Sequence, residues 1–391
     1  MRYLHYGVCA AVSLASVLCI AGPMAAQSRM KYIDPSLPEY KPQPVEVPKD
    51  RGYVMRDGSI RIVGFDDMAG MVARWNALFE RTHQGIRFTP LLKGNGTALP
   101  AITYDMTLLA PEGGGATLLE LLPYEKIYGS KKDPVAALII RVGHGSLTPG
   151  AKMSPLAIVT NRENTLPSIT EGEVASIFST GAGTGDITSW LQLGYPRAAV
   201  GTLPIHPVGL YWDAYQRPED EYMGEYMMYR HFGTFPGHVF SPNYEQYLTY
   251  KEVAKTVEHD RAAIGILALN DVDKELRVVP MPATDGKGMT TGSAEDIIAD
   301  RYPYPRDLYF YIRREPGTPM DPLMAEYVRM VLSKEGQEAI AADAKGYLPL
   351  NKRDVNEELE RLNRARTWAP RSKQGPKLNF PFPSPEPIGN E

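Results

Sequence analysis

Two turns in this sequence each join a short apolar run to a helical pattern, an arrangement that binds anions. The first is Gly64-Phe65-Asp66-Asp67, which follows Ile60-Arg61-Ile62-Val63, and the second is Lys93-Gly94-Asn95-Gly96-Thr97-Ala98. The first backbone N–H groups of a helix have no intrahelical partner, and the helix dipole adds partial positive charge there. Two such turns facing one cleft would bind a dehydrated oxyanion. The alternative is that each turn only connects a strand to a helix.

Residue patterns for covalent, metal or nucleotide chemistry are not found in the sequence. The seven histidines form no His-Glu-x-x-His or His-x-His pair that would chelate zinc. Gly143-His144-Gly145-Ser146 departs from a nucleophile elbow, because the second glycine follows the histidine. Gly113-Gly114-Gly115 and Gly286-Lys287-Gly288 lack the ending of a phosphate-binding P-loop and are interpreted as plain loops. We therefore predict no catalytic residue, no metal, no cofactor and no enzymatic activity.

The elements that would position the two turns alternate between β runs and amphipathic helices. Strands are predicted at residues 60–63, 86–88, 156–159, 264–267 and 308–312. Helices are predicted from near Met68, after the capping boxes Thr170/Glu173 and Thr249/Glu252, and from Pro322 with Asp321 as N-cap. Such alternation is typical of an α/β fold.

The start of the chain predicts export. Arg2 is followed by an apolar run and by Pro23-Met24-Ala25-Ala26, so residues 1–26 are interpreted as a signal peptide cleaved after Ala26. Both cysteines, Cys9 and Cys19, lie within it. Cleavage would leave no thiol for a disulfide, a nucleophile or a metal site. A lipoprotein anchor at Cys19 is the alternative, but Ser16-Val17-Leu18 before it lacks the expected small residues.

The composition excludes other classes of protein. With 391 residues and 43% hydrophobic residues, the chain is long enough for two domains and too apolar to be disordered. A net charge of −4 gives no electrostatic attraction to nucleic acid or to anionic lipid. Proline-rich stretches at residues 27–51 and 367–391 predict extended arms. These arms wrap the protein, reach a partner or are simply loose, and the last is the default expectation.

Six segments in order resemble the PstS-like family of phosphate-binding proteins, together covering residues 58–352. The segments are residues 64–79 with the turn at 93–98 and the run 101–111, then 155–166, 170–194, 262–266, 304–313, and 332–338 with 346–350. The resemblance implies a type II periplasmic-binding fold, an α/β architecture of two lobes with a ligand cleft between them. It implies capture of phosphate or a related oxyanion for an inner-membrane ABC permease by a periplasmic monomer that closes around its ligand.

The resemblance also implies a division of the chain. Residues 52–155 and 296–366 would form the first lobe and residues 156–295 the second. Residues 1–26, 27–51 and 367–391 would be the signal peptide, the N-terminal arm and the C-terminal tail.

The resemblance places the ligand in contact with both lobes, although this chain departs from the family pattern. Asp66 and Asp67 stand where the family has hydroxyl donors, and carboxylates would repel a dianion unless they point away or accept its proton. In the family one Asp accepts that proton, and Asp105 is a further candidate. The second lobe has Val208-Gly209-Leu210-Tyr211-Trp212 in place of the family's Arg and Ser-Gly-Thr. The residues predicted to bind the ligand are Gly64, Phe65, Asp66, Asp67, Gly96, Thr97, Ala98, Asp105, Gly209 and Tyr211.

Two alternative functions stay open on the sequence. Tyr211, Trp212 and Tyr215 would suit an organic or cationic solute, with Asp66 and Asp67 as counter-charges. The proline-rich arms would suit a sensory or interaction protein that binds no ligand. Tyr222, Tyr226 and Tyr229 follow on one helical face, which more often belongs to a core or a surface than to a binding site.

Overall fold

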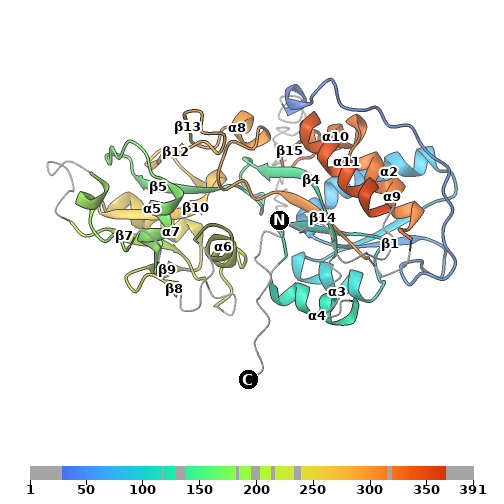
Figure 1. The fold of residues 1–391 in the computed structure, drawn as a ribbon, viewed down its shortest axis with the longest axis horizontal. Coiled ribbons are helices and arrows are strands. Elements are labelled where there is room, and N and C mark those ends of the chain that lie inside the picture. Colours follow the sequence, from blue (N-terminus) through green and yellow to red (C-terminus); the bar gives the residue numbers. More distant parts are fainter. Residues whose placement is uncertain are drawn as a thin grey trace, which may run out of the picture.

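A computed structural model describes residues 29–116, 118–128, 137–181, 185–194, 203–212, 216–232, 239–314 and 319–366. The predicted signal peptide and C-terminal tail lie outside these residues. The described chain forms two lobes, each built around its own β-sheet (Figure 1). Within the described residues, no helix combines the length and apolarity needed to cross a bilayer.

The first lobe contains a four-stranded sheet in the order β15-β4-β14-β3 and the parallel pair β1-β2. Its strands are β1 (Ile60–Gly64), β2 (Phe88–Leu92), β3 (Ala110–Gly113), β4 (Leu138–Ser146), β14 (Leu308–Ile312) and β15 (Tyr347–Leu348). Its helices are α2 (Ala69–Thr82), α3 (Ala98–Thr103), α4 (Leu118–Tyr128), α9 (Pro322–Val331), α10 (Lys334–Ala341) and α11 (Lys352–Arg366). Trp75 of α2 is buried and donates from Nε1 to the carbonyl oxygen of Gly336 at 2.9 Å, which joins α2 to α10.

The second lobe contains a five-stranded sheet in the order β11-β5-β10-β7-β9. Its strands are β5 (Leu156–Asn161), β7 (His206–Leu210), β9 (Glu245–Tyr247), β10 (Ala263–Ala268) and β11 (Leu276–Val278), with the short pairs β6 (Ser179–Thr180) and β8 (Val239–Phe240), and β12 (Met281–Pro282) and β13 (Met289–Thr290). Its helices are α5 (Glu171–Phe178), α6 (Met223–Tyr226), α7 (Tyr250–His259) and α8 (Ala294–Ile298).

Helix α7 packs directly on strand β10 because of one glycine. A Cβ added at Gly265 would lie 2.8 Å from Cγ2 of Val257, so a larger residue would push the helix off the sheet. Strands β5 and β10 are buried at every residue, which explains the apolar runs Leu156–Val159 and Ala263–Ala268 in the sequence.

Several local sequence signals are confirmed. Thr170 and Glu173 form a capping box at α5, and Thr249 and Glu252 form one at α7. Asp321 caps α9 with Pro322 in its first turn. Helix α2 begins at Ala69, one residue after the expected start. The strand expected at 86–88 is shifted, since β2 begins at Phe88 and ends at Leu92.

The chain crosses between the two sheets twice. One crossing lies between the end of β4 at Ser146 and the start of β5 at Leu156, and the other between the end of α8 at Ile298 and the start of β14 at Leu308. The exact division into residues 52–155, 156–295 and 296–366 stays a prediction.

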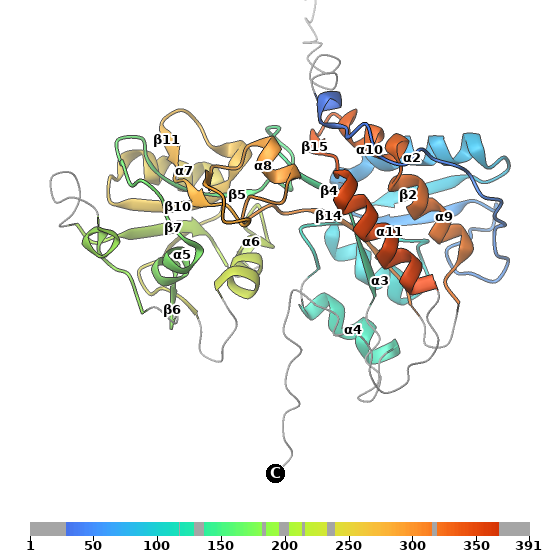
Figure 2. The same ribbon diagram turned by 45° about the horizontal axis from the view of Figure 1, so that its top comes forward.

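The described part of the N-terminal arm, residues 29–50, packs along the first lobe, so the default expectation of a loose arm is wrong there. Figure 2 shows this dark blue segment running over the helices of that lobe. The backbone N–H of Tyr40 donates to Oε2 of Glu335 at 2.8 Å, and its hydroxyl donates to Oε1 of Glu326 at 2.8 Å. Leu37 is buried in the core of this lobe.

Candidate functional site

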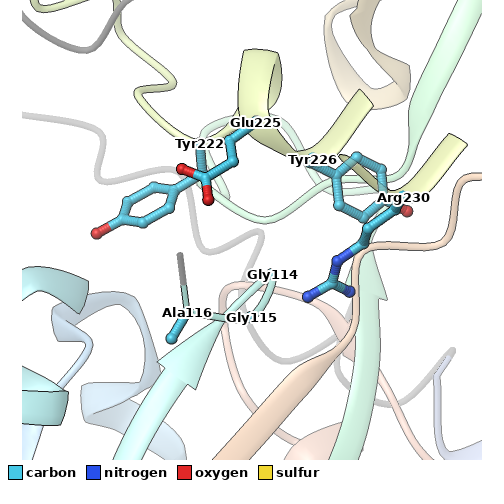
Figure 3. A pocket seen from close by; sticks show the side chains of 7 residues that line it. All are labelled: Gly114, Gly115, Ala116, Tyr222, Glu225, Tyr226 and Arg230. Atoms are coloured by element: carbon cyan, nitrogen blue, oxygen red, sulfur yellow. The ribbon is translucent and has the colours of Figure 1, made fainter. Parts of the chain in front are cut away.

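A pocket lies where the two lobes face each other. The turn after β3 lines it with Gly114, Gly115 and Ala116, and the segment around α6 lines it with Tyr222, Glu225, Tyr226 and Arg230 (Figure 3). Helix α6 is on the side of the second lobe that faces the first (Figure 1). The site is therefore built from the backbone of one lobe and the side chains of the other.

The turn after β3 requires glycine for both conformation and space. Gly114 and Gly115 have φ angles of 74° and 91°, in the left-handed region that residues with a Cβ rarely adopt. A Cβ on Gly115 would lie 2.1 Å from Nη2 of Arg230. The turn is fixed by two hydrogen bonds, from Gly114 N to Asp307 O at 2.9 Å and from Ala116 N to the hydroxyl of Tyr311 at 2.8 Å. The sequence favoured a plain loop here, and the structure instead places this turn in the pocket.

Arg230 supplies the positive charge of the pocket. It lies in the π-helical segment Met227–Phe232 that continues α6, and such segments are frequent at functional sites. Its guanidinium points toward the Gly114–Gly115 turn, while Tyr222 and Glu225 lie together on the other side of the pocket (Figure 3). Its Cζ lies 5.4 Å from the centre of the Tyr226 ring, within cation–π range.

Glu112 is a buried acid immediately before the glycine turn. Its side chain is inaccessible to solvent, and neither carboxyl oxygen has a hydrogen-bond partner among the described residues. Burial, reinforced by the negative charge of Glu120, raises the pKa of Glu112 well above its usual value. The hydroxyl of Tyr222 from the second lobe donates to Oε1 of Glu120 at 3.1 Å, so the lobes also touch here. A neutral carboxyl group can both donate and accept a hydrogen bond.

A second arginine lies behind the glycine turn. Arg306 is 1% exposed and forms a two-pronged ion pair with Asp220 of the second lobe. Its Cζ lies 5.7 Å from the centre of the Tyr226 ring, on which Arg230 also sits.

The first predicted turn lies beside the strand that leads into the pocket. Gly64 ends β1, and the N–H of Phe65 donates to the carbonyl oxygen of Pro111 in β3 at 2.9 Å. Asp66 pairs with Nζ of Lys152 at 2.7 Å. Asp67 is buried, pairs with Nζ of Lys345 at 2.7 Å and accepts from the hydroxyl of Tyr347 at 2.5 Å.

The second predicted turn is tied to the glycine turn through Asn95. The side-chain amide of Asn95 donates to Gly113 O at 2.8 Å, and its Oδ1 accepts from Gly113 N at 3.0 Å. Gly96 and Thr97 lie in the short helix Asn95–Thr97, and Ala98 begins α3. The hydroxyl of Thr97 donates to Gly94 O at 2.8 Å.

The remaining predicted residues lie elsewhere. Asp105 pairs with Nη1 of Arg313 at 2.9 Å and accepts from the backbone N–H of Gly52 at 2.7 Å. Gly209 lies within β7 against Tyr244, and the N–H of Tyr211 donates to Tyr247 O at 2.9 Å. Tyr215 lies outside the described residues. None of the ten predicted residues is among the seven that line the pocket, and their role in binding stays a prediction.

Sequence reasoning missed Glu225, Arg230 and the glycine turn as residues of the pocket. A signal for the turn exists, since a charged residue in a buried strand, Glu112, stands directly before three glycines. Tyr222 and Tyr226 were recognised as a helical stripe, but their position in the pocket depends on contacts with the other lobe.

One group of side chains has the composition of a metal site. His144, Asp300 and Asp354 offer ligand atoms within 4.8 Å of one another. Arg141 pairs with Asp300 at 2.7 Å and with Asp354 at 3.1 Å, and Arg353 pairs with both. Because two guanidinium groups already neutralise these carboxylates, the group is an ion-pair network that disfavours a cation.

Comparisons with known proteins agree with this architecture. A domain described as a PBP superfamily domain matches residues 152–335. The chain is 25% identical over 352 residues to the phosphate-binding protein PstS of Pseudomonas aeruginosa, which covers 89% of this chain and 98% of that protein.

Solved structures of phosphate-binding proteins are similar at lower identity. PstS from Borrelia burgdorferi is similar with a TM-score of 0.50 and 15% identity, over 75% of this chain and 98% of that one. An ABC-type phosphate transport receptor from Vibrio cholerae has a TM-score of 0.47 and 16% identity, over 74% and 99%. The chain is therefore similar to a PBP superfamily domain over residues 152–335 and to the phosphate-binding protein PstS along most of its sequence.

Proposed function

We propose that this protein captures phosphate or a related oxyanion outside the cytoplasm and delivers it to an ABC permease in the inner membrane. The observation that carries the proposal is the position of Arg230, which reaches from one lobe to the glycine turn of the other in the pocket between them. An anion there would be held by a guanidinium and by backbone of the opposite lobe. The PstS relatives support phosphate as the first ligand to test.

Glu112 supports an oxyanion that carries a proton. As a buried carboxyl group without a hydrogen-bond partner among the described residues, it would accept the proton of a monoprotonated oxyanion or donate its own. In this proposal Glu112 is the acid that exchanges a proton with the oxyanion. The sequence suggested Asp105 for this role, but the carboxylate of Asp105 pairs with Arg313 and accepts from the backbone N–H of Gly52.

The proposal includes no covalent step and no enzymatic activity. Binding would close the lobes around the ligand, and the closed form would be what the permease binds. The periplasm as the compartment rests on the signal peptide expected at residues 1–26, and the protein is proposed to act as a monomer.

Titration calorimetry with phosphate, arsenate, sulfate and molybdate tests the proposal. In thermal unfolding, a ligand present at 100 times its dissociation constant should raise the free energy of unfolding by about 2.7 kcal/mol. Arg230→Gln should weaken phosphate binding by roughly tenfold or more, since a charge-assisted hydrogen bond is lost. Arg162→Gln is the matched control, because Arg162 is 61% exposed and pairs with Glu275 on the surface of the second lobe. The absence of binding to all four anions would overturn the proposal.

A second candidate ligand is an organic solute that carries positive charge. Tyr222, Tyr226 and Glu225 favour it, because they present aromatic rings and a carboxylate to the pocket. The counter-charges first expected for it, Asp66 and Asp67, are paired with Lys152 and Lys345. Glu225→Gln separates the two ligands, since it should strengthen phosphate binding and weaken the binding of a cationic solute found by screening amino acids and polyamines.

A further inference from the structure

Arg306 occupies an unusual position on the segment that returns from the second lobe to the first. It lies two residues before β14 and is 1% exposed. Its φ angle of 49° is in the left-handed region, a strained conformation for a residue with a side chain. Strained residues of this kind cluster at ligand-binding sites.

The two terminal nitrogens of the Arg306 guanidinium bind a residue of the second lobe. Nη1 and Nη2 each donate to one carboxylate oxygen of Asp220, which is 6% exposed. The hydroxyl of Tyr250 donates to the same carboxylate at 2.8 Å. This arrangement fixes the guanidinium in one orientation.

The third donor of the guanidinium, the Nε–H group of Arg306, does not take part in this ion pair. It is buried and has no hydrogen-bond partner among the described residues. Nε and Nη2 lie 3.7 Å and 3.6 Å from the position that a Cβ would occupy on Gly114, and the guanidinium lies over the ring of Tyr226. Gly114 and Tyr226 both line the pocket. A buried donor without a partner is costly, so a donor in this position is expected to gain a partner when the pocket fills.

We propose that Arg306 is a ligand-binding residue that donates from Nε to an oxygen of the bound oxyanion at the floor of the pocket. This inference rests on the proposed function. Arg230 would hold the anion from the second lobe, and Arg306 would hold it from the connection between the lobes. Asp220 would orient the guanidinium without touching the ligand.

The alternative is that Arg306 and Asp220 only hold the structure together. Replacing one partner would not separate these roles, because the remaining buried charge would destabilise the protein. Replacing both by apolar residues of similar volume removes the donor and leaves no charge unpaired, and such replacements of buried ion pairs are often neutral for stability. The informative variant is therefore Arg306→Met with Asp220→Leu.

Calorimetric titration with inorganic phosphate and thermal unfolding without ligand are measured on the full mature protein. We expect the double variant to keep the wild-type melting temperature within a few degrees and to bind phosphate roughly 10- to 100-fold more weakly. The matched control is Arg329→Met with Glu326→Leu, an ion pair on α9 remote from the pocket, which should leave phosphate affinity unchanged. Unchanged affinity in the Arg306 and Asp220 variant would overturn the inference.

Two further outcomes are decisive. If the double variant does not fold, Arg306→Lys keeps the positive charge and removes the Nε–H donor, and wild-type affinity in that variant overturns the inference. If the wild-type protein binds none of phosphate, arsenate, sulfate and molybdate, the proposed function fails and this inference fails with it. Binding by the wild-type protein together with unchanged affinity in the variants refutes the role of Arg306 alone.

Discussion

Arg306 and Asp307 are consecutive residues whose side chains bind opposite lobes. Arg306 pairs with Asp220 of the second lobe. Asp307 accepts from Nδ1 of His144 at 2.9 Å and pairs with Nη1 of Arg141 at 3.3 Å, both on β4 of the first lobe. One short stretch of backbone is therefore held from both sides where the chain passes between the lobes.

The network around Asp307 should make stability depend on pH. Burial alone would lower the pKa of His144, but the negative charge of Asp307 and its hydrogen bond with Nδ1 of the ring outweigh burial and raise it. A histidine whose pKa is raised by folding stabilises the protein fully below its unfolded pKa, and this contribution is lost as pH rises through the folded pKa. His144→Gln should therefore be less stable than the wild type at pH 6, with a gap that narrows by pH 9. Urea unfolding across this range tests the expectation, and a gap independent of pH would contradict it.

Gly115→Ala should impair ligand binding more than folding. The added Cβ would lie 2.1 Å from Nη2 of Arg230, a flexible side chain that would be displaced from the pocket. Gly150→Ala is the control, because Gly150 has a similar φ of 80° and no atom within 4 Å of an added Cβ. Both variants should lose about 1–2 kcal/mol of stability from backbone strain. In calorimetry only Gly115→Ala should bind phosphate roughly tenfold more weakly, and equal affinities would argue against the role of Arg230.

Glu358→Gln should stabilise the protein at alkaline pH. Burial raises the pKa of Glu358 to about 7, although Arg361 and Arg141 oppose the shift. The unfolded chain loses this proton near pH 4.5, so ionising the buried group costs stability as pH rises from there toward 7. The variant avoids this cost and should be more stable than the wild type at pH 8 by on the order of 1–3 kcal/mol. Guanidinium chloride unfolding at pH 5 and pH 8 measures it, with a smaller difference expected at pH 5.

Removal of the N-terminal arm, residues 29–50, should lower stability without changing ligand affinity. The arm packs on α9 and α10 through Tyr40, Glu326 and Glu335, and these contacts lie away from the pocket residues. A loss of several kcal/mol would lower the melting temperature by roughly 5–15 °C. Tyr40→Phe removes only the hydroxyl contact with Glu326 and should cost about 1 kcal/mol. Unchanged melting of the shortened protein would show that the arm contributes nothing to stability.

The sequence predicted those features that depend on residues close together in the chain. The capping boxes at Thr170 and Thr249 need only three residues, and Asp321 with Pro322 needs two, so local signals were sufficient. The sequence predicted that Asp66 and Asp67 would repel an anion. It could not show that Lys152 and Lys345 neutralise these carboxylates, because both lysines come from distant segments of the chain.

The pocket could not be read from local pattern, because it forms between residues far apart in the chain. Tyr222 and Glu120, which meet across the lobes, are separated by 102 positions. A tyrosine stripe at helical spacing and a run of three glycines each have ordinary local explanations. Only their meeting, with Arg230 between them, gives a site.

The docked arm has a consequence for the order in which the chain folds. Tyr40 is made near the beginning of synthesis, and its partner Glu335 follows 295 positions later. The N-terminal arm therefore cannot dock until almost the whole chain has been made. Contacts between residues so distant in sequence slow folding, so completion of the first lobe is a late event that follows synthesis.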